Sequence, residues 1–271
     1  MTLPDSPPHD PIIAIDRVRK SYRFESQLTH AIDEISLAVE PGSFTSIIGP
    51  SGCGKSTLLQ IVAGLNEASG GAVHFHGRPV TAPPRGMIYV FQQYEKSIFP
   101  WRTVAQNVML GIEGQRGISR SERDGRVADH LNLVGLTGAA DRYPAHLSGG
   151  MQQRVAIARA LICAPEVLLM DEPFSAVDAL TRATLQDLLL EIRSRISLTV
   201  LFVTHDVEEA IYLSTHVLAM TRSPARVDDF LTIDLPYPRS QIATREAPRF
   251  LEYRHRLFSR LFAQETGIVP A

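Results

Sequence analysis

The sequence predicts an α/β protein whose parallel sheet carries a phosphate-binding loop. Three stretches predict this fold: a glycine-rich turn at Gly49 to Thr57 that follows an apolar run, and two more apolar runs, Val167 to Met170 and Leu198 to Val203. Short apolar runs are typical of strands that are buried on both faces of a parallel sheet. Polar residues follow each run, so we expect them to meet at the sheet edge where ligands bind in open α/β folds.

The glycine-rich turn, GPSGCGKST, follows the apolar run Phe44 to Ile48 and precedes another, Leu58 to Leu65. The spacing G-x4-G-K-S in a strand–turn–helix context is the P-loop pattern, and a turn that binds nothing is the weaker alternative. Glycines let successive N–H groups face an anion, and the helix adds the positive end of its dipole. The lysine can reach the β- and γ-phosphates, and the serine hydroxyl can bind Mg²⁺. The predicted nucleotide contacts are Gly49, Pro50, Ser51, Gly52, Cys53, Gly54, Lys55, Ser56 and Thr57, with Ser56 also a magnesium ligand.

Composition and charge exclude several classes of protein. The 271 residues include 27 Lys and Arg and 29 Asp and Glu, a formal net charge of −2, so no overall field favours nucleic acid. Two cysteines, Cys53 and Cys163, are too few for a four-thiolate zinc site and are typical of a reducing compartment. No run reaches the ~18 apolar residues of a membrane-spanning helix, and the start lacks a signal-peptide core. We expect any link to a membrane to go through another protein.

The chain divides into three predicted parts. Residues 1–11 are rich in proline, and we expect them to be disordered. Residues 12–235 are expected to form the main domain, in which antiparallel strands precede the phosphate loop and a helical subdomain spans about 95–163. Residues 236–271 are expected to form a helical tail.

The sequence from Arg222 on is expected to be less regular until a terminal amphipathic helix begins. We expect this helix to dock on the protein's own core, with a partner as the alternative. Its apolar residues near helical spacing are Phe250, Leu251, Leu257, Leu261 and Phe262.

Two adjacent carboxylates follow the apolar run Val167 to Met170. We expect Asp171 to hold Mg²⁺ or its water, as in P-loop enzymes generally. Glu172 is then placed to polarise the attacking water, a role worth about 10²–10⁴-fold in rate. A pair of ordinary loop acids is the alternative.

Three isolated residues are further candidates. Gln92 follows the apolar run Met87 to Phe91 and can contact Mg²⁺ or the attacking water, unless it only caps a loop. His205 follows another strand and can hydrogen-bond the γ-phosphate, although such a histidine is often structural. Tyr22 can stack on a base, or it is simply a half-buried strand tyrosine. After His205, Asp206 and a later Glu209 predict a capping box at the start of a helix.

A second candidate anion site begins at Ser148. Ser148, Gly149 and Gly150 precede a predicted helix, Met151 to Cys163, and a helix N-terminus attracts anions. The chain has one P-loop, so this site is either an ordinary N-cap or it serves a nucleotide held by another copy of the chain.

Together these motifs resemble the ATP-binding subunit of ABC transporters, from about Ile12 to Thr221. Gly49 to Thr57 is similar to the Walker A loop, Leu147 to Leu161 to the ABC signature with its helix, and Val167 to Pro173 to Walker B with the catalytic glutamate. The resemblance implies a P-loop NTPase (RecA-like) core with an antiparallel β subdomain and an inserted α-helical subdomain. It also implies ATP and Mg²⁺ as ligands.

The resemblance assigns roles to the isolated residues as well. It implies that Gln92 is the Q-loop glutamine, His205 the switch histidine and Tyr22 the adenine-stacking aromatic. A head-to-tail dimer with a second copy is implied, with ATP between one chain's P-loop and the other's signature. The signature residues expected at that nucleotide are Ser148, Gly149, Gly150 and Gln152. One departure is the D-loop, where Val177 stands in place of the usual leucine.

Two stretches, Phe99 to Val108 and Pro236 to His255, resemble the nitrate/sulfonate/taurine importer group. This implies uptake of a small, often anionic solute, membrane permease subunits as partners, and an extracytoplasmic solute-binding protein that acts indirectly. The expected location is the cytoplasmic face of the inner membrane, without nucleic acid. The alternative is a soluble, non-transport ABC ATPase in DNA maintenance or a regulatory cassette. DNA-maintenance relatives carry long coiled coils between their nucleotide motifs, whereas about 90 residues without sustained heptads separate Thr57 from the signature here.

Overall fold

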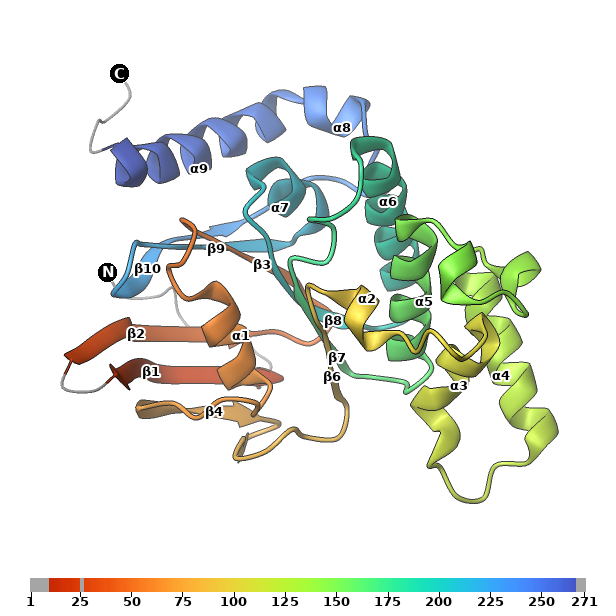
Figure 1. The fold of residues 1–271 in the computed structure, drawn as a ribbon. Helices are drawn as coiled ribbons and strands as arrows, with labels where there is room; N and C mark the ends of the chain where they lie inside the picture. Colours follow the sequence, from red (N-terminus) through yellow and green to blue (C-terminus); the bar gives the residue numbers. More distant parts are fainter. Residues whose placement is uncertain (1–9, 25–26, 267–271) are drawn as a thin grey trace.

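The predicted parallel strands lie together at one end of a larger mixed sheet (Figure 1). The computed structural model describes residues 10–24 and 27–266. Within them the strand order is β5-β4-β1-β2-β10-β9-β3-β8-β7-β6. Strands β9, β3, β8, β7 and β6 run parallel to one another. Their bounds are β3 Phe44–Ile48, β6 Met87–Val90, β7 Val167–Asp171, β8 Thr199–Val203 and β9 His216–Met220.

One pair of antiparallel strands precedes the phosphate loop, as the sequence predicts, and a second pair follows it. β1 pairs with β2 and with β4, and β4 pairs with β5, in each case antiparallel. These strands are β1 Ile13–Phe24, β2 Gln27–Val39, β4 Gly70–Phe75 and β5 Arg78–Pro79.

The prediction that the chain becomes less regular from Arg222 on is wrong for strand β10, Ala225–Thr232. This strand pairs with β9 and with β2 and so connects the two groups of strands. Its inward position Asp229 interrupts the apolar alternation on which the prediction depended. Asp229 is nearly buried because Arg256 Nε donates to it at 2.9 Å and Arg260 lies 3.1 Å away.

The central strands are buried on both faces, which explains their continuous apolar runs. In β7, Val167 and Leu169 pack on one side with helix α1, Lys55–Val62, and with β1 and β2. Leu168 and Met170 pack on the other side with the helices from α3 to α7. Helix α1 therefore lies between the antiparallel strands and the parallel strands (Figure 1).

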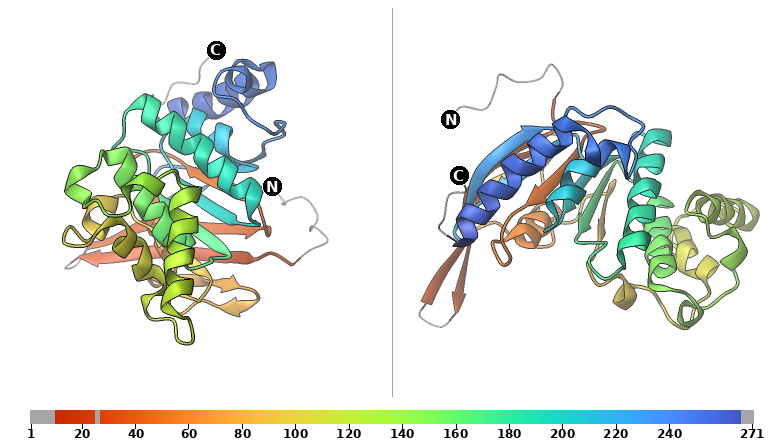
Figure 2. Two further views of the ribbon diagram at one scale, coloured as in Figure 1. Left: turned by 90° about the vertical axis from the view of Figure 1, so that its right-hand side faces the viewer. Right: turned by 90° about the horizontal axis from the view of Figure 1, so that it is seen from above.

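A lobe of helices extends from one side of the sheet (Figure 2). No strand occurs between residues 91 and 166, all of which the structure describes. The elements of this lobe are α2 Tyr94–Ser97, α3 Val104–Glu113, α4 Arg120–Leu133, η1 Thr137–Ala139, η2 Pro144–His146 and α5 Gly149–Leu161. Helices α6 Ala179–Arg195 and α7 Val207–Leu213 follow β7 and β8.

The chain ends in two helices, α8 Ala243–Glu246 and α9 Pro248–Thr266, of which α9 lies across α7 (Figure 1). Phe250 and Leu257 of α9 are fully buried in the core, so the predicted amphipathic helix docks on the protein itself. Leu251 and Phe262 stay partly exposed. The division of the chain at residues 12 and 235 stays a prediction, and residues 1–9 of the expected disordered segment lie outside the described residues.

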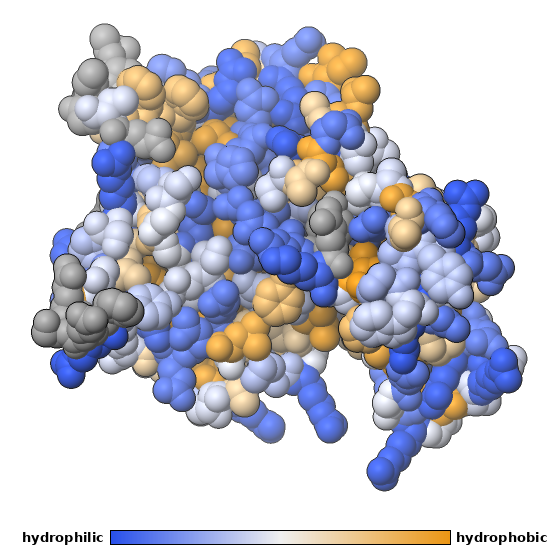
Figure 3. Space-filling model, viewed as in Figure 1, coloured by the Kyte–Doolittle hydropathy of each residue, from blue (hydrophilic) through white to orange (hydrophobic). Residues whose placement is uncertain are grey.

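Hydrophilic side chains cover much of the face shown in Figure 3, with smaller apolar areas between them. Among the described residues, no helix combines the length and the apolar composition that a membrane crossing needs.

Candidate active site

The loop between β3 and α1 forms an open cradle of backbone amides. Gly52 and Gly54 have φ angles of 73° and 109°, which L side chains rarely adopt. Gly54 is the N-cap of α1 and offers no side chain to the first N–H groups of the helix, which stay available to an anion. A cavity of about 250 Å³ lies here. It is lined by Ser51, Gly52, Gly54, Lys55, Ser56, Thr57 and Glu172.

Lys55 is folded back onto this loop. Its Nζ donates to the carbonyl oxygens of Gly49 at 2.8 Å and of Pro50 at 3.1 Å, and the side chain is 5% exposed. These bonds use two of the three ammonium donors, and no carboxylate among the described residues lies within ion-pair distance of it. A buried ammonium with neutral partners favours an anionic ligand, which fits the phosphates of a nucleotide.

Ser56 and Asp171 come together as the sequence predicts. Ser56 Oγ donates to Asp171 Oδ1 at 2.8 Å, and the hydroxyl of Tyr89 donates to Asp171 Oδ2 at 2.9 Å. Burial raises the pKa of Asp171, and the bonds from Ser56 and Tyr89 oppose that rise. Within the described part of the chain, no three His, Cys, Asp or Glu residues are grouped as a metal site. The serine and aspartate oxygens therefore fit Mg²⁺ that keeps waters and phosphate oxygens as its other ligands.

Tyr89 is the residue of this site that sequence reasoning missed. It lies on β6, directly beside β7, and was counted only as part of an apolar run. A tyrosine hydroxyl in a buried strand needs a hydrogen-bond partner, so the residue type itself was the signal.

The predicted catalytic residues Glu172, His205 and Gln92 converge on one carboxylate oxygen. His205 Nδ1 lies 2.9 Å from Glu172 Oε2, and Gln92 Nε2 donates to the same oxygen at 3.5 Å. Glu172 has a φ angle of 42°, an unfavourable conformation for a side chain of this size, and its N–H donates to Val203 O at 2.9 Å. Backbone strain of this kind clusters at active sites. It directs the carboxylate from the end of β7 into the P-loop cavity.

The signature residues are not part of this cavity. The Ser148 side chain accepts from Met151 N at 3.3 Å and caps α5. A Cβ on Gly150 would lie 2.3 Å from the side chain of Thr181 of α6, so any other residue there would have to displace that side chain. Gln152 donates to Pro144 O at 3.0 Å and to Leu147 O, which anchors the preceding turn.

Tyr22 also lies apart from the P-loop cavity. Its ring is 43% exposed, and its hydroxyl accepts from Asn66 Nδ2 at 3.1 Å, just beyond the C-terminal end of α1. Lys20 Nζ lies 4.9 Å from the ring centroid.

Comparisons with known proteins show the family of this chain. The family model for ABC transporters matches residues 32–175. The chain belongs to the ABC transporter family. The nitrate import ATP-binding protein NrtC of Synechococcus elongatus is 43% identical over 93% of this chain and 38% of its own length. The bicarbonate transport ATP-binding protein CmpD of the same organism is 41% identical over 93% of this chain and 91% of its own.

A solved structure of a dimeric, post-hydrolysis ATP-binding cassette bound to ADP and Pi is also similar. It has a TM-score of 0.72 and 31% identity, over 82% of this chain and 98% of the other. The protein therefore has the P-loop NTPase fold of ABC cassettes, and it is an ATPase subunit of the importer type, similar to nitrate importers.

Proposed function

We propose that this protein hydrolyses ATP to drive uptake of a small anionic solute such as nitrate, a sulfonate or taurine. The observation that carries the solute class is the similarity to the nitrate import protein along 93% of this chain. The similar bicarbonate transport protein also takes its name from a small anion.

The reaction itself is assigned to the P-loop cavity. In this proposal Lys55 and the N-terminal end of α1 bind the β- and γ-phosphates, and Tyr22 stacks on the adenine. Ser56 and Asp171 hold Mg²⁺, which neutralises charge on the phosphates when it is bound. The partly buried Ser56–Asp171 contact of 2.8 Å supports this assignment, since the two oxygens already lie within reach of one cation.

Glu172 is the proposed general base. Its carboxylate accepts the proton of the attacking water, while His205 and Gln92 orient it and lie ready to reach the γ-phosphate or the water. Their contacts of 2.9 and 3.5 Å with Glu172 support a joint role.

The proposal completes the site with a second copy of the chain. Ser148, Gly149, Gly150 and Gln152 of one copy then face the nucleotide held by the P-loop of the other. Their separation from the P-loop cavity within one chain supports this arrangement, as does the dimeric state of the similar cassette. The dimer is proposed to bind permease subunits at the cytoplasmic face of the membrane, which pass on a solute from an extracytoplasmic binding protein.

The test is a pull-down from native membranes with the tagged chain as bait, and with an unrelated tagged protein as the control. We expect a multi-helix permease and a solute-binding protein to be recovered with this bait alone. The binding protein can then be screened against nitrate, bicarbonate, sulfonates and taurine. Recovery of only soluble partners, such as DNA-associated proteins, would overturn the transport role.

A further inference from the structure

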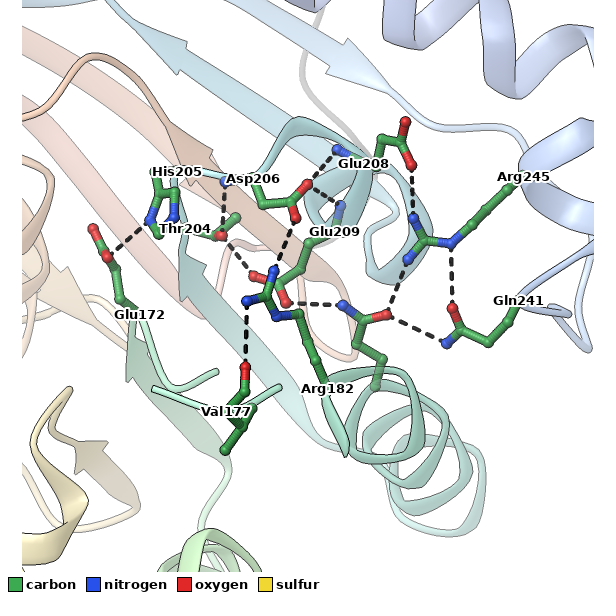
Figure 4. Close-up of polar contacts among 11 residues, drawn as sticks. Glu172, Val177, Arg182, Thr204, His205, Asp206, Glu208, Glu209, Gln241 and Arg245 are labelled. Atoms are coloured by element: carbon green, nitrogen blue, oxygen red, sulfur yellow. Dashed lines mark hydrogen bonds and ion pairs between the residues drawn. The ribbon is translucent and has the colours of Figure 1, made fainter. Parts of the chain in front are cut away.

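A chain of hydrogen bonds connects residues 241–245, called the C-terminal segment below, to the turn that holds His205 (Figure 4). It begins at the two neighbours of His205. Asp206 N donates to Thr204 Oγ1 at 3.0 Å, and Thr204 Oγ1 donates to Glu209 Oε2 at 2.6 Å. Glu209 is only 4% exposed.

The predicted capping box at this helix is therefore wrong in its second half. Asp206 does accept from Glu208 N and Glu209 N, as an N-cap should. Glu209 does not return a bond to Asp206 N, because Thr204 takes that position. The glutamate side chain points into the protein instead, where it accepts the hydrogen bond from Thr204 and so stabilises the turn.

Gln186 of α6 connects this turn to the C-terminal segment. Its Nε2 donates to Glu209 Oε1 at 2.9 Å. Its Oε1 accepts from Arg245 at 3.1 Å and from Gln241 at 3.3 Å. A guanidinium can only donate, so Arg245 fixes the orientation of the amide and keeps the NH₂ group towards Glu209.

We propose that Gln241 and Arg245 are positioning residues for His205. They orient Gln186, which hydrogen-bonds Glu209. Glu209 in turn keeps the Thr204–Asp206 turn in the position where His205 contacts Glu172. The C-terminal segment thereby sets the rate of ATP turnover without touching the nucleotide. The inference rests on the proposed catalytic role of His205.

A second contact fixes the same turn from the other side. Arg182 donates to Asp206 Oδ2 at 3.4 Å and to Val177 O at 3.5 Å. The turn is thus held between the D-loop and the C-terminal segment (Figure 4). A loss on one side leaves the other contact in place, so the fold survives while the position of His205 becomes less defined.

Arg245 also has a simpler role that a test must separate. It forms an ion pair with Glu208 at 2.8 Å, which attaches α8 to α7. Arg254 of α9 forms an ion pair with the same glutamate at 3.2 Å and has no described bond to Gln186. Arg254→Ala is therefore the matched control, since it removes a Glu208 ion pair and leaves the amide alone.

The experiment measures kcat and KM for ATP, ATP affinity and thermal stability in the purified full chain and its variants. Arg245→Ala should lower kcat by about three- to tenfold with KM and ATP affinity within about twofold, because one orienting donor is lost. Arg254→Ala should leave kcat within about 1.5-fold, since an exposed ion pair contributes little. Equal kcat losses in the two variants would overturn the inference.

A double-mutant cycle with Gln186→Met tests the route. Gln186→Met keeps the side-chain volume but removes both the donor and the acceptor. If Arg245 acts through Gln186, Arg245→Ala should have little further effect on kcat in the Gln186→Met chain. Independent, multiplying effects would contradict the route.

His205→Ala distinguishes the proposed catalytic role of His205 from its proposed positioning by the C-terminal segment. If it leaves turnover unchanged, the proposed role of His205 fails. If it abolishes turnover while Arg245→Ala behaves like Arg254→Ala, the catalytic role stands and only the positioning by the C-terminal segment fails.

Discussion

Helices α1 and α5 both begin at glycine-rich turns, yet the two starts are built differently. At α1 the N-cap is Gly54, which has no side chain to satisfy the first amides. Lys55 and Glu172 line the cavity in front of them, and Asp171 accepts a hydrogen bond from Ser56. At α5 the Ser148 hydroxyl already accepts from the third residue, and Gly150 is closed off by Thr181. The start of α1 therefore leaves its first amides open to an anion beside charged side chains, whereas the start of α5 is already capped by its own serine.

This difference shows why a phosphate site cannot be inferred from glycines and a helix start alone. The α1 start has a lysine as counter-charge, the proposed metal-binding oxygens and the proposed general base within one chain. The α5 start lacks all three, so in our proposal it contributes only hydrogen-bond donors to a nucleotide that another copy of the chain holds. The following predictions test that contrast, from the largest expected effect to the smallest.

Glu172→Gln should lower the rate of ATP hydrolysis by about 10²–10⁴-fold, because the amide cannot accept the proton of the attacking water. ATP binding should be kept, and an ATP-bound dimer should accumulate. Single-turnover hydrolysis and size-exclusion chromatography with ATP measure both effects. Hydrolysis at the native rate would show that Glu172 is not the general base.

Lys55→Ala should weaken ATP binding to the chain by about 10- to 100-fold, because the phosphates lose a charge-assisted contact. Ser148→Ala should change this affinity by less than twofold, since in our proposal α5 binds the nucleotide of the other copy and not that of its own chain. Titration calorimetry at a protein concentration that keeps the chain monomeric measures both. Equal losses of affinity would mean that both helix starts bind the same nucleotide.

The Cys53 thiol offers the smallest effect and a pH dependence. Cys53 is 2% exposed, and burial raises its pKa while Lys55 opposes the rise. A raised pKa leaves less thiolate at neutral pH, so alkylation by iodoacetamide should be slow at pH 7 and should accelerate as the pH passes the ordinary thiol range. In a Cys163→Ala chain, bound ATP should slow this reaction further. Fast modification at pH 7 at a rate that does not depend on ATP would contradict the buried position of Cys53 in the phosphate loop.

The sequence was sufficient to predict those features that depend only on residues close together in the chain. The strand before the P-loop, the two acids at the end of β7 and the capping serine of α5 all follow from residues within a few positions of one another. It was insufficient where a side chain is explained by a distant partner. Strand β10 was missed because Asp229 faces inward, and its partners Arg256 and Arg260 lie on α9. No residue close to Asp229 in the sequence indicates that these two arginines are its partners.

The polar interior of the site shows the same limit. Tyr89 was hidden in an apolar run because its partner, Asp171, comes from another strand. Glu209 was assigned to a capping box, although Thr204 and Gln186 bind its carboxylate instead. Hydrogen bonds between elements depend on the fold, so these roles could not be derived before the strands and helices were placed.

The central claim is that each ATP is bound between the P-loop of one chain and the signature of another. A mixture of Lys55→Ala chains with Ser148→Arg chains tests it directly, since each variant alone lacks one half of every site. In a mixed dimer, the Ser148→Arg chain supplies an intact P-loop and the Lys55→Ala chain an intact signature. We predict that mixing restores ATP hydrolysis well above the sum of the separate variants, after each is shown to be folded. Hydrolysis that stays at that sum would contradict the claim.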